Sequence, residues 1–381
     1  MASIRQHRGK WQARYYDPSG RLRSRSFARK SDARAFLAAV ETDKRRGEWT
    51  DPRLGRVTLG EYVETWAATK ANVRARTRLN VEGRLRAHIL PVFGPVALGA
   101  IQPADVRAWV AELSAKGLAP STVKATYLTF GQIMRTAEID GIIHRSPCIG
   151  VELPADSSRT EMHFLTPGQV AALASSVDDR YRCLIFTAAY TGMRAGELGA
   201  LKLERVNLLK RTVDVVESLG EVRGVLTTGP TKTGKRRTVS LPSFLADMIG
   251  AHIGSYPGRD GYVFTAAQGG PIRQHNFRER HFKPATRRAG LPEGVRFHDL
   301  RHTCAAILID QGSNPKQIQA RLGHASIRTT LDRYGHLFDG HDAALLEGLD
   351  ATYREAKVNL NVAQTWPKRG PVVPLRLTRD P

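Results

Sequence analysis

The sequence has few cysteines and no long hydrophobic run. Its three cysteines are an odd number, lie far apart and include no Cys-x-x-Cys pair, which excludes a disulfide framework and a zinc knuckle. We interpret Cys148, Cys183 and Cys304 as buried thiols in a reducing cytoplasm. No stretch of about 18 uncharged apolar residues exists, and no apolar segment follows the basic start of the chain. We therefore expect neither a membrane span nor a signal peptide.

Acidic residues are also scarce. The chain has 36 Asp and Glu against 58 Lys and Arg, which gives a net charge of +22. Such an excess indicates a polyanionic partner, with nucleic acid as the first candidate. The 41% hydrophobic and 25% charged residues are typical of a globular protein and exclude wholesale disorder. A chain of 381 residues predicts two or three domains.

The basic charge is concentrated in residues 1–56, which hold 15 Lys and Arg against 6 Asp and Glu. An alternating apolar pattern around Trp11, a turn at 17–20 and a second run to Phe27 predict a small three-stranded sheet. A helix from a Ser31 cap to Arg46 follows. A two-stranded ribbon fits the major groove of DNA, and a solvated basic face is the alternative. We expect four arginines to point outward from the ribbon toward DNA: Arg14, Arg21, Arg23 and Arg25.

Residues 57–145 have the period of amphipathic helices. We predict a bundle of four helices: one after a Thr58 cap, one from Arg76 to Ile89 that ends at Pro91, one from Pro103 to Gly117, and one from Pro120. Trp66 and Trp109 are expected in its core. Five arginines crowd the start of the second helix: Arg74, Arg76, Arg78, Arg84 and Arg86. The first three, Arg74, Arg76 and Arg78, are our candidates to bind a DNA backbone.

The remaining chain has three parts. Residues 146–163, with their prolines and serines, read as a linker. Residues 164–355 form a third domain, which is helical with a strand-rich stretch at 212–242. In the tail, 356–381, the alternation of Val358, Leu360 and Val362 predicts a strand. The expected fold is therefore multidomain and mostly α with small β-sheets.

Several polar residues of the third domain stand at positions that suit chemistry on a phosphate. Arg194 follows a glycine-punctuated turn at a helix start, with Glu197 one turn on. The segment 298–302 places three side chains on one helix face, and Lys232 lies in a tight turn between two strands. The three side chains of that face are His298, Arg301 and His302, and His324 and Tyr334 follow later in the chain.

Each of these residues also has an ordinary structural interpretation. Arg194 and Glu197 alone would form a surface ion pair, and Tyr334 alone would be a half-buried aromatic residue. His298 and His302 are spaced as half of a zinc site, with His324 as the third ligand. However, Asp299 stands where the zinc motif has glutamate. We therefore expect no metal.

Together, in this order and spacing, the motifs from Arg194 to Tyr334 resemble those of the tyrosine recombinases, in the phage-integrase branch. The resemblance covers residues 164 to about 350. It also extends to the helices of 57–145, which are similar to that family's core-binding domain. The small basic segment 1–56 is similar to the arm-type DNA-binding domain of integrases.

The resemblance implies a transesterification that uses no cofactor. Tyr334 would attack a DNA phosphodiester, form a 3′-phosphotyrosyl bond and release a 5′-hydroxyl. Arg194 and Arg301 would bind the non-bridging oxygens, since guanidinium groups match their geometry. His298 and His324 would add hydrogen bonds, and His298 would also accept the phenolic proton. Lys232 would protonate the leaving oxygen, with Lys235 as its rival. Glu197 would orient Arg194, and His302 would have a structural role.

The expected function is integration or excision of a phage or mobile element. The implied partners are double-stranded DNA attachment sites, a homotetramer of this chain, a DNA-bending host factor and a directionality factor, at the nucleoid of a bacterial cell. Three alternatives are a chromosome-dimer resolvase or other tyrosine recombinase, a type IB topoisomerase and a non-catalytic DNA-binding module. Residues 1–56 favour an integrase over a resolvase, and Arg194, Arg301 and Tyr334 argue against a non-catalytic module.

Overall fold

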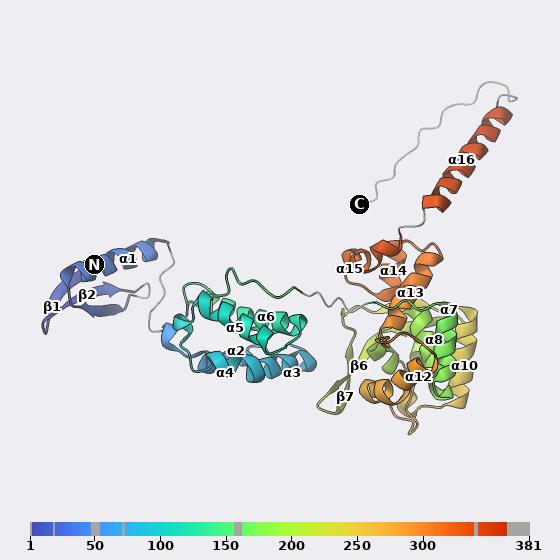
Figure 1. Ribbon diagram of the computed structural model, residues 1–381, viewed down its shortest axis with the longest axis horizontal. Coiled ribbons are helices and arrows are strands. Elements are labelled where there is room, and N and C mark those ends of the chain that lie inside the picture. The colour runs from blue at the N-terminus through green and yellow to red at the C-terminus, as the bar shows by residue number, and fades with distance from the viewer. Residues whose placement is uncertain are drawn as a thin grey trace. The chain divides into compact units, whose positions relative to one another are not determined.

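The computed structural model describes residues 2–17, 20–46, 54–70, 73–155, 162–338 and 342–363. The chain divides into two compact units, Met1–Glu161 and Met162–Pro381, each of which is described by itself. Figure 1 shows helices in most of the chain and short antiparallel strands in both units. The prediction of a mostly α protein with small β-sheets is confirmed.

The first unit begins with a three-stranded antiparallel sheet and one helix. The strands β1 (Ser3–His7), β2 (Lys10–Tyr16) and β3 (Leu22–Phe27) pair in chain order. The alternation along β2 buries Ala13 and Tyr15 against α1 (Lys30–Arg46), which supplies Leu37 and Val40 to the same core. The helix begins one residue before the predicted Ser31 cap.

The helical part of this unit is built from amphipathic segments, as its period predicts. Thr58 caps the helix that begins at Leu59 and forms a capping box with Glu61 in its first turn. Trp109 and Trp66 are 2% and 3% exposed, in the core as expected. Phe130 stacks on Phe93 at 4.8 Å between ring centroids. The helices are α2 (Leu59–Ala68), α3 (Ala75–Arg84), α4 (Leu90–Phe93), α5 (Pro103–Ala115) and α6 (Pro120–Ile139).

The second predicted helix does not end at Pro91. One π-helical turn, Leu85–Ile89, joins α3 to α4, and Pro91 lies in the first turn of α4. A proline within a helix clashes with the carbonyl four residues earlier, and the wider π-turn accommodates this disturbance. The prediction was wrong because it assumed an unbroken α-helical hydrogen-bond pattern.

The first half of the predicted linker packs on this unit. Cys148, Val151 and Leu153 contact the core of the helical bundle, so residues 146–155 are not a free connection. Residues 156–161 lie outside the described residues.

The second unit is helical around small sheets. Strand β5 (Thr212–Val215) pairs with β4 (Val206–Asn207) and β8 (Arg237–Ser240), while β6 (Glu217–Val222) and β7 (Val225–Pro230) form a separate hairpin. The hydrophobic core of this unit is formed by α8 (Asp179–Thr191) and the helices packed around it. The helices are α7 (Pro167–Ser176), α8 (Asp179–Thr191), α9 (Ala195–Gly199), α10 (Ser243–Ser255), α11 (Gln274–Phe277), α12 (Lys283–Arg288), α13 (Asp299–Asp310), α14 (Pro315–Leu322), α15 (Ile327–Tyr334) and α16 (Asp342–Ala363).

The predicted strand at Val358, Leu360 and Val362 is wrong, because α16 continues through these positions to Ala363. Three alternating residues are a weak strand signal, and the alanine, leucine, glutamate, lysine and arginine around them favour helix. Among the described residues, no helix is both long and apolar enough to cross a membrane. Cys183 and Cys304 are buried and Cys148 is partly buried, each as a free thiol.

We predict that Phe130→Ala lowers the stability of the helical bundle by about 3 to 5 kcal/mol, because it empties a fully buried site. Hydrogen exchange of peptides from residues 59–139 measures this change. Leu128 lies on the same helix but is 57% exposed, so Leu128→Ala is the matched control and should change the stability by less than about 0.5 kcal/mol. Equal effects of the two variants would contradict the packing described here.

Candidate active site

The site is organised around the C-terminal end of α14. The last carbonyls of a helix lack helical partners and carry partial negative charge. Here three consecutive carbonyls each accept a hydrogen bond from a different arginine. The bonds run from Arg237 Nε to Arg321 O (3.0 Å), from Arg301 Nη2 to Leu322 O (2.7 Å) and from Arg194 Nη2 to Gly323 O (3.3 Å).

Two glycines make this close approach of helices possible. Gly192 ends α8 with φ +66° and its carbonyl accepts a second hydrogen bond from Arg301. A Cβ at Gly192 would lie 2.3 Å from the side chain of Leu322, so a larger residue does not fit. Gly323 ends α14 with φ +68°, the left-handed conformation that glycine adopts without strain.

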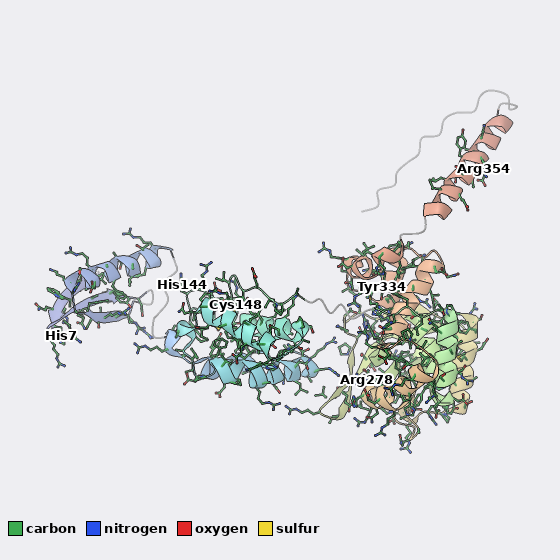
Figure 2. All side chains as sticks on the ribbon, in the orientation of Figure 1. His7, His144, Cys148, Arg278, Tyr334 and Arg354 are labelled. Atoms are coloured by element: carbon green, nitrogen blue, oxygen red, sulfur yellow. The ribbon has the colours of Figure 1, made fainter. Side chains whose placement is uncertain are left out.

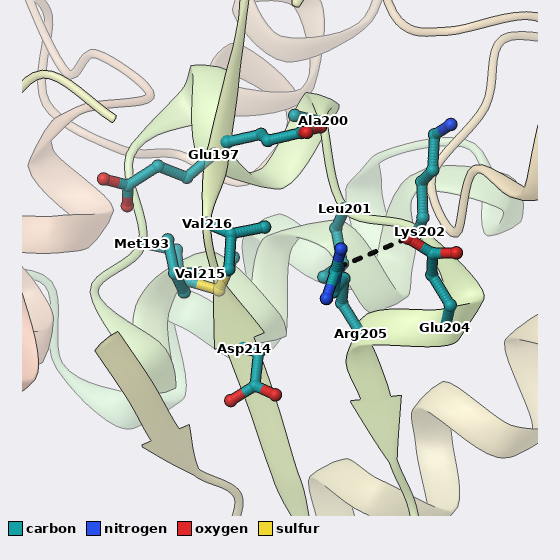
Figure 3. Close-up of a pocket in the computed structure, with 11 residues that line it drawn as sticks. Met193, Glu197, Ala200, Leu201, Lys202, Glu204, Arg205, Asp214, Val215 and Val216 are labelled. Carbon is teal, nitrogen blue, oxygen red and sulfur yellow. Dashed lines mark ion pairs between the residues drawn. The ribbon is translucent and has the colours of Figure 1, made fainter. Parts of the chain in front are cut away.

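Arg194 is held by a buried carboxylate. It precedes α9, and its Nη1 donates to Glu197 Oε1 at 2.8 Å. The Glu197 side chain is 1% exposed, and Figure 3 shows a pocket that it lines together with Lys202, Glu204 and Arg205. Burial alone would raise the pKa of Glu197, but hydrogen bonds and charges from Arg237 and Arg194 lower it. Glu197 is therefore an ionised anchor between two cations.

Arg237 is a residue of the site that the sequence analysis missed. Its Nη2 lies 2.7 Å from Glu197 Oε2 and its Nη1 lies 3.1 Å from Glu197 Oε1. It follows Lys235 and Arg236, both exposed, so its charge alone did not distinguish it. The sequence did contain one indication that Arg237 is buried. Residues two apart in a strand share a face, which puts Arg237 on the same face of β8 as the buried Val239.

The histidines occupy three different environments. His298 stands at the N-terminal end of α13 and is exposed, whereas His302 one turn later is 3% exposed. Their rings are 5.0 Å apart. His324 is half-buried, and its Nδ1 is hydrogen bonded to Thr330 Oγ1 at 2.9 Å. Burial and the charges of Arg301 and Arg194 lower the pKa of His324 to about 3, so its imidazole is neutral near pH 7.

Tyr334, which is labelled in Figure 2, lies at the end of α15. Its side chain is completely buried. A hydrogen bond of 2.8 Å joins its Oη to His302 Nδ1. Its ring stacks on that of His324 at 6.4 Å and meets Phe164 edge-on at 6.5 Å. Burial raises the pKa of Tyr334 to about 12, although the charges of Arg301 and Arg333 oppose the rise. The phenol is therefore protonated and shielded from solvent in this structure.

The structure thus brings together seven of the eight residues assigned to catalysis or its support: Arg194, Glu197, His298, Arg301, His302, His324 and Tyr334. The phenol contacts His302, for which only a structural role was expected. Burial lowers the pKa of His302 to about 4, so this hydrogen bond joins two neutral groups.

Lys232 and its rival Lys235 lie on the turn between β7 and β8, and both are exposed. Gly234 closes this turn with φ +72° and a 2.9 Å hydrogen bond to Thr231 O. Within the part of the chain that the structure describes, no group of three or more His, Cys, Asp or Glu side chains is arranged to hold a metal ion.

The arginines predicted to project together from the N-terminal sheet lie on both of its faces. Arg14 is on the open face, whereas Arg23 forms an ion pair with Asp17 at 2.9 Å and Arg25 lies 5.2 Å from the ring of Phe36 in α1. Arg21 is exposed at the end of the turn. Strand pairing places Arg23 opposite Tyr15 and Arg25 opposite Ala13, on the helix-covered face rather than on that of Arg14. Arg25 is nevertheless exposed, and DNA binding by these arginines stays a prediction.

The open face carries a row of polar side chains instead. Arg5 Nε donates to Gln12 Oε1 at 2.8 Å, and Gln12 Nε2 donates to Ser24 Oγ at 3.2 Å. Arg14 pairs with Ser24 across the strands on the same face. In the helical bundle, the three predicted arginines are all exposed at the start of α3: Arg74, Arg76 and Arg78.

Comparison with known proteins finds matches over most of the chain. Residues 163–341 match the phage integrase family, residues 58–114 the SAM-like N-terminal domain of phage integrases, and residues 3–46 the phage integrase N-terminal domain. The putative prophage phiRv2 integrase of Mycobacterium tuberculosis is 32% identical over 362 residues, which cover 90% of this chain and 93% of that protein.

Two solved structures show the same fold. The Tn1549 transposon integrase in complex with a circular intermediate DNA matches with a TM-score of 0.68 at 23% identity, over 76% of this chain and 99% of that one. A lambda integrase tetramer bound to a Holliday junction matches with a TM-score of 0.55 at 19% identity, over 85% and 95% of the two chains.

We predict that Tyr334 resists acetylation by N-acetylimidazole in the free protein. Because modification requires local opening, Tyr334 should react at least about tenfold more slowly than an exposed tyrosine. Tyr16, which is 45% exposed, is the internal control, and mass spectrometry of the two peptides measures both rates. His302→Ala removes the hydrogen-bond partner of the phenol and should increase the rate at Tyr334 only. Equal rates at Tyr334 and Tyr16 in the unaltered protein would contradict the buried position.

Proposed function

We propose that this tyrosine recombinase cuts and rejoins DNA through a covalent bond between Tyr334 and a 3′-phosphate. The chain belongs to the phage integrase family. The observation that carries this proposal is the grouping of Arg194, Arg301, His324 and Tyr334 at the end of α14. Two guanidinium groups and a phenol are the donors and the nucleophile that phosphoryl transfer to tyrosine requires.

The arginines bind the phosphate in this proposal. Arg301 uses two of its five N–H groups on the carbonyls of Gly192 and Leu322, so its remaining donors are available for a phosphate oxygen. Arg194, with 20% of its side chain exposed, supplies the second guanidinium, and His324 adds a neutral donor. Preorganised donors stabilise the charge that spreads over the non-bridging oxygens in the transition state.

The bond changes balance without an external energy source. The phenol oxygen of Tyr334 forms a bond to phosphorus as the bond from phosphorus to the 5′-oxygen breaks. We propose that Lys232 protonates that leaving oxygen, and that His298, exposed at the start of α13, accepts the phenolic proton. Since Tyr334 has no exposed surface in the free chain, the end of α15 must move before the phenol meets a phosphate. The phosphotyrosyl bond conserves the energy needed for rejoining.

The DNA contacts are divided among the parts of the chain. We propose an arm-type DNA-binding domain in residues 1–56, which uses the open sheet face with Arg5 and Arg14, and a core-binding domain in residues 57–145, which uses the exposed arginines of α3. Residues 164–355 form the catalytic domain. The sheet of residues 3–27 favours an integrase over a resolvase, and its ligands would be the attachment sites of a phage or mobile element.

Assembly on DNA is a further part of the proposal. Lambda integrase forms a tetramer on a Holliday junction, and we propose a homotetramer for this chain, at the nucleoid of a bacterial cell. Leu346, Leu349 and Tyr353 are 61%, 58% and 68% exposed on α16 at the spacing of one helix face. This apolar stripe suits packing against a second copy of the chain. A DNA-bending host factor and a directionality factor complete the proposed set of partners.

We predict that the unaltered protein forms a covalent DNA adduct in EDTA and that Tyr334→Phe does not, because only the phenol oxygen can become the ester oxygen. The substrate is plasmid DNA that carries the sequence next to the gene, and denaturing gel electrophoresis detects the adduct. Tyr190→Phe, which removes a phenol elsewhere in this unit, is the control and should leave the adduct unchanged. An adduct with Tyr334→Phe would remove Tyr334 from its role.

We predict that Leu346→Glu with Leu349→Glu prevents tetramer formation on paired sites but leaves binding to a single site unchanged, because the charges disrupt only the apolar stripe. Analytical ultracentrifugation with DNA measures the assembly. Arg354 lies on the same helix with 78% of its side chain exposed, so Arg354→Ala is the matched control. A tetramer of unchanged stability with the double variant would rule out packing through α16.

A further inference from the structure

Arg237 is an arginine of the site that has no part in the chemistry proposed above. It is the first residue of β8, and its side chain is only 10% exposed. Two of its nitrogens bind the two carboxylate oxygens of Glu197, and its Nε binds Arg321 O. All three nitrogens of the guanidinium group are therefore engaged within the protein.

The side chain of Arg237 holds both oxygens of the Glu197 carboxylate. A two-point contact between guanidinium and carboxylate fixes the plane of both groups. The guanidinium of Arg194 makes a single contact to Glu197, from Nη1 to Oε1 at 2.8 Å, and a longer one of 3.3 Å to Gly323 O, while its backbone N–H donates to Glu197 Oε2 at 2.9 Å. The position of the Arg194 guanidinium therefore depends on the position of a carboxylate that Arg237 also holds.

Arg237 also packs against the loop that carries His324. A Cβ built at Gly323 would lie 3.0 Å from Arg237 Cδ and 3.1 Å from its Nη1, so the guanidinium lies directly against this backbone. The end of α14 and the carboxylate that holds Arg194 thus share one anchor. That anchor lies in the strand that follows the Lys232 turn.

We propose that Arg237 is a positioning residue for the phosphate-binding Arg194 and acts through the carboxylate of Glu197. This inference rests on the proposed function. Arg237 does not touch the DNA. It sets the place where Arg194 meets the charge of the scissile phosphate, and a displacement of about 1 Å at such a group is enough to slow a reaction about 100-fold.

The competing explanation is that Arg237 only stabilises the fold by neutralising a buried carboxylate. The two explanations differ in how the defect of an Arg237 variant depends on the charge of the phosphate. A methylphosphonate at the scissile position has a methyl group in place of one non-bridging oxygen and carries no charge. If Arg237 works through Arg194, this substrate removes most of the need for both residues.

The experiment compares two nicked duplexes that differ only at the scissile position, a phosphodiester and a methylphosphonate. Their sequence is that of the crossover located by the Tyr334 adduct. Arg237→Gln should slow adduct formation about 100-fold on the phosphodiester, the usual cost of one preorganised donor, and should approach the unaltered rate on the methylphosphonate. Arg194→Gln should show the same pattern. Arg237→Lys should lie in between, because an ammonium cannot make the two-point contact.

Two controls separate this pattern from a general loss of activity. Lys232→Ala should be slow on both duplexes, because its defect lies in protonation of the leaving oxygen. Arg273→Gln removes an ion pair with Glu221 of 2.6 Å that is outside the site, and should match the unaltered protein on both. Thermal unfolding and DNA binding are measured for every variant. If Arg237→Gln does not fold, Arg237→Lys decides the comparison.

The outcomes distinguish this inference from the proposed function. If the unaltered protein forms no adduct, the proposed function fails. If it forms the adduct and Arg237→Gln is equally fast on the phosphodiester, Arg237 has no positioning role. A defect of the same size on both duplexes shows a purely structural role and also overturns the inference. Recovery on the methylphosphonate alone supports it.

Discussion

The structure of the site depends on the unpaired carbonyls at the end of α14. Three arginines, from α13, from β8 and from the residue that precedes α9, donate to three consecutive carbonyl oxygens there. The same arginines would repel one another without a negative partner, and the helix end and the carboxylate of Glu197 supply it. This one interaction brings three cations from distant parts of the chain together at one helix end.

The phenol of Tyr334 lies beside this cluster of charge but is shielded from solvent. Tyr334 is buried against Phe164 and His324 and is hydrogen bonded to His302, with a pKa raised to about 12. In the free chain the arginines are thus held in place, while the phenol is neither deprotonated nor exposed. If Tyr334 is the nucleophile, as proposed above, this burial keeps the free protein from attacking DNA until the end of α15 has moved.

The N-terminal sheet shows how packing divides basic residues between binding and support. Arg5 and Arg14 lie on the open face. On the face toward α1, Arg23 neutralises Asp17 and Arg25 covers the rings of Phe27 and Phe36. A high local charge therefore overstates the number of basic side chains on any one face of the sheet. The open face carries Arg5 and Arg14 together with the neutral polar side chains of Gln12 and Ser24.

The sequence by itself determined most of the elements and the order of the motifs, but not the helix at Val358 to Val362 or the continuation of the helix through Pro91. The helices of the bundle, the Lys232 turn and the candidates from Arg194 to Tyr334 follow from spacing, caps and glycines, which act over a few residues. Only the tertiary structure decided that Arg237 belongs to the site, that His302 rather than His298 contacts the phenol, and that Arg23 and Arg25 face α1. Arg237 and Glu197 are 40 residues apart, and Tyr334 and His302 are 32 apart. Local patterns carry no information on such contacts, because they arise when distant segments pack together.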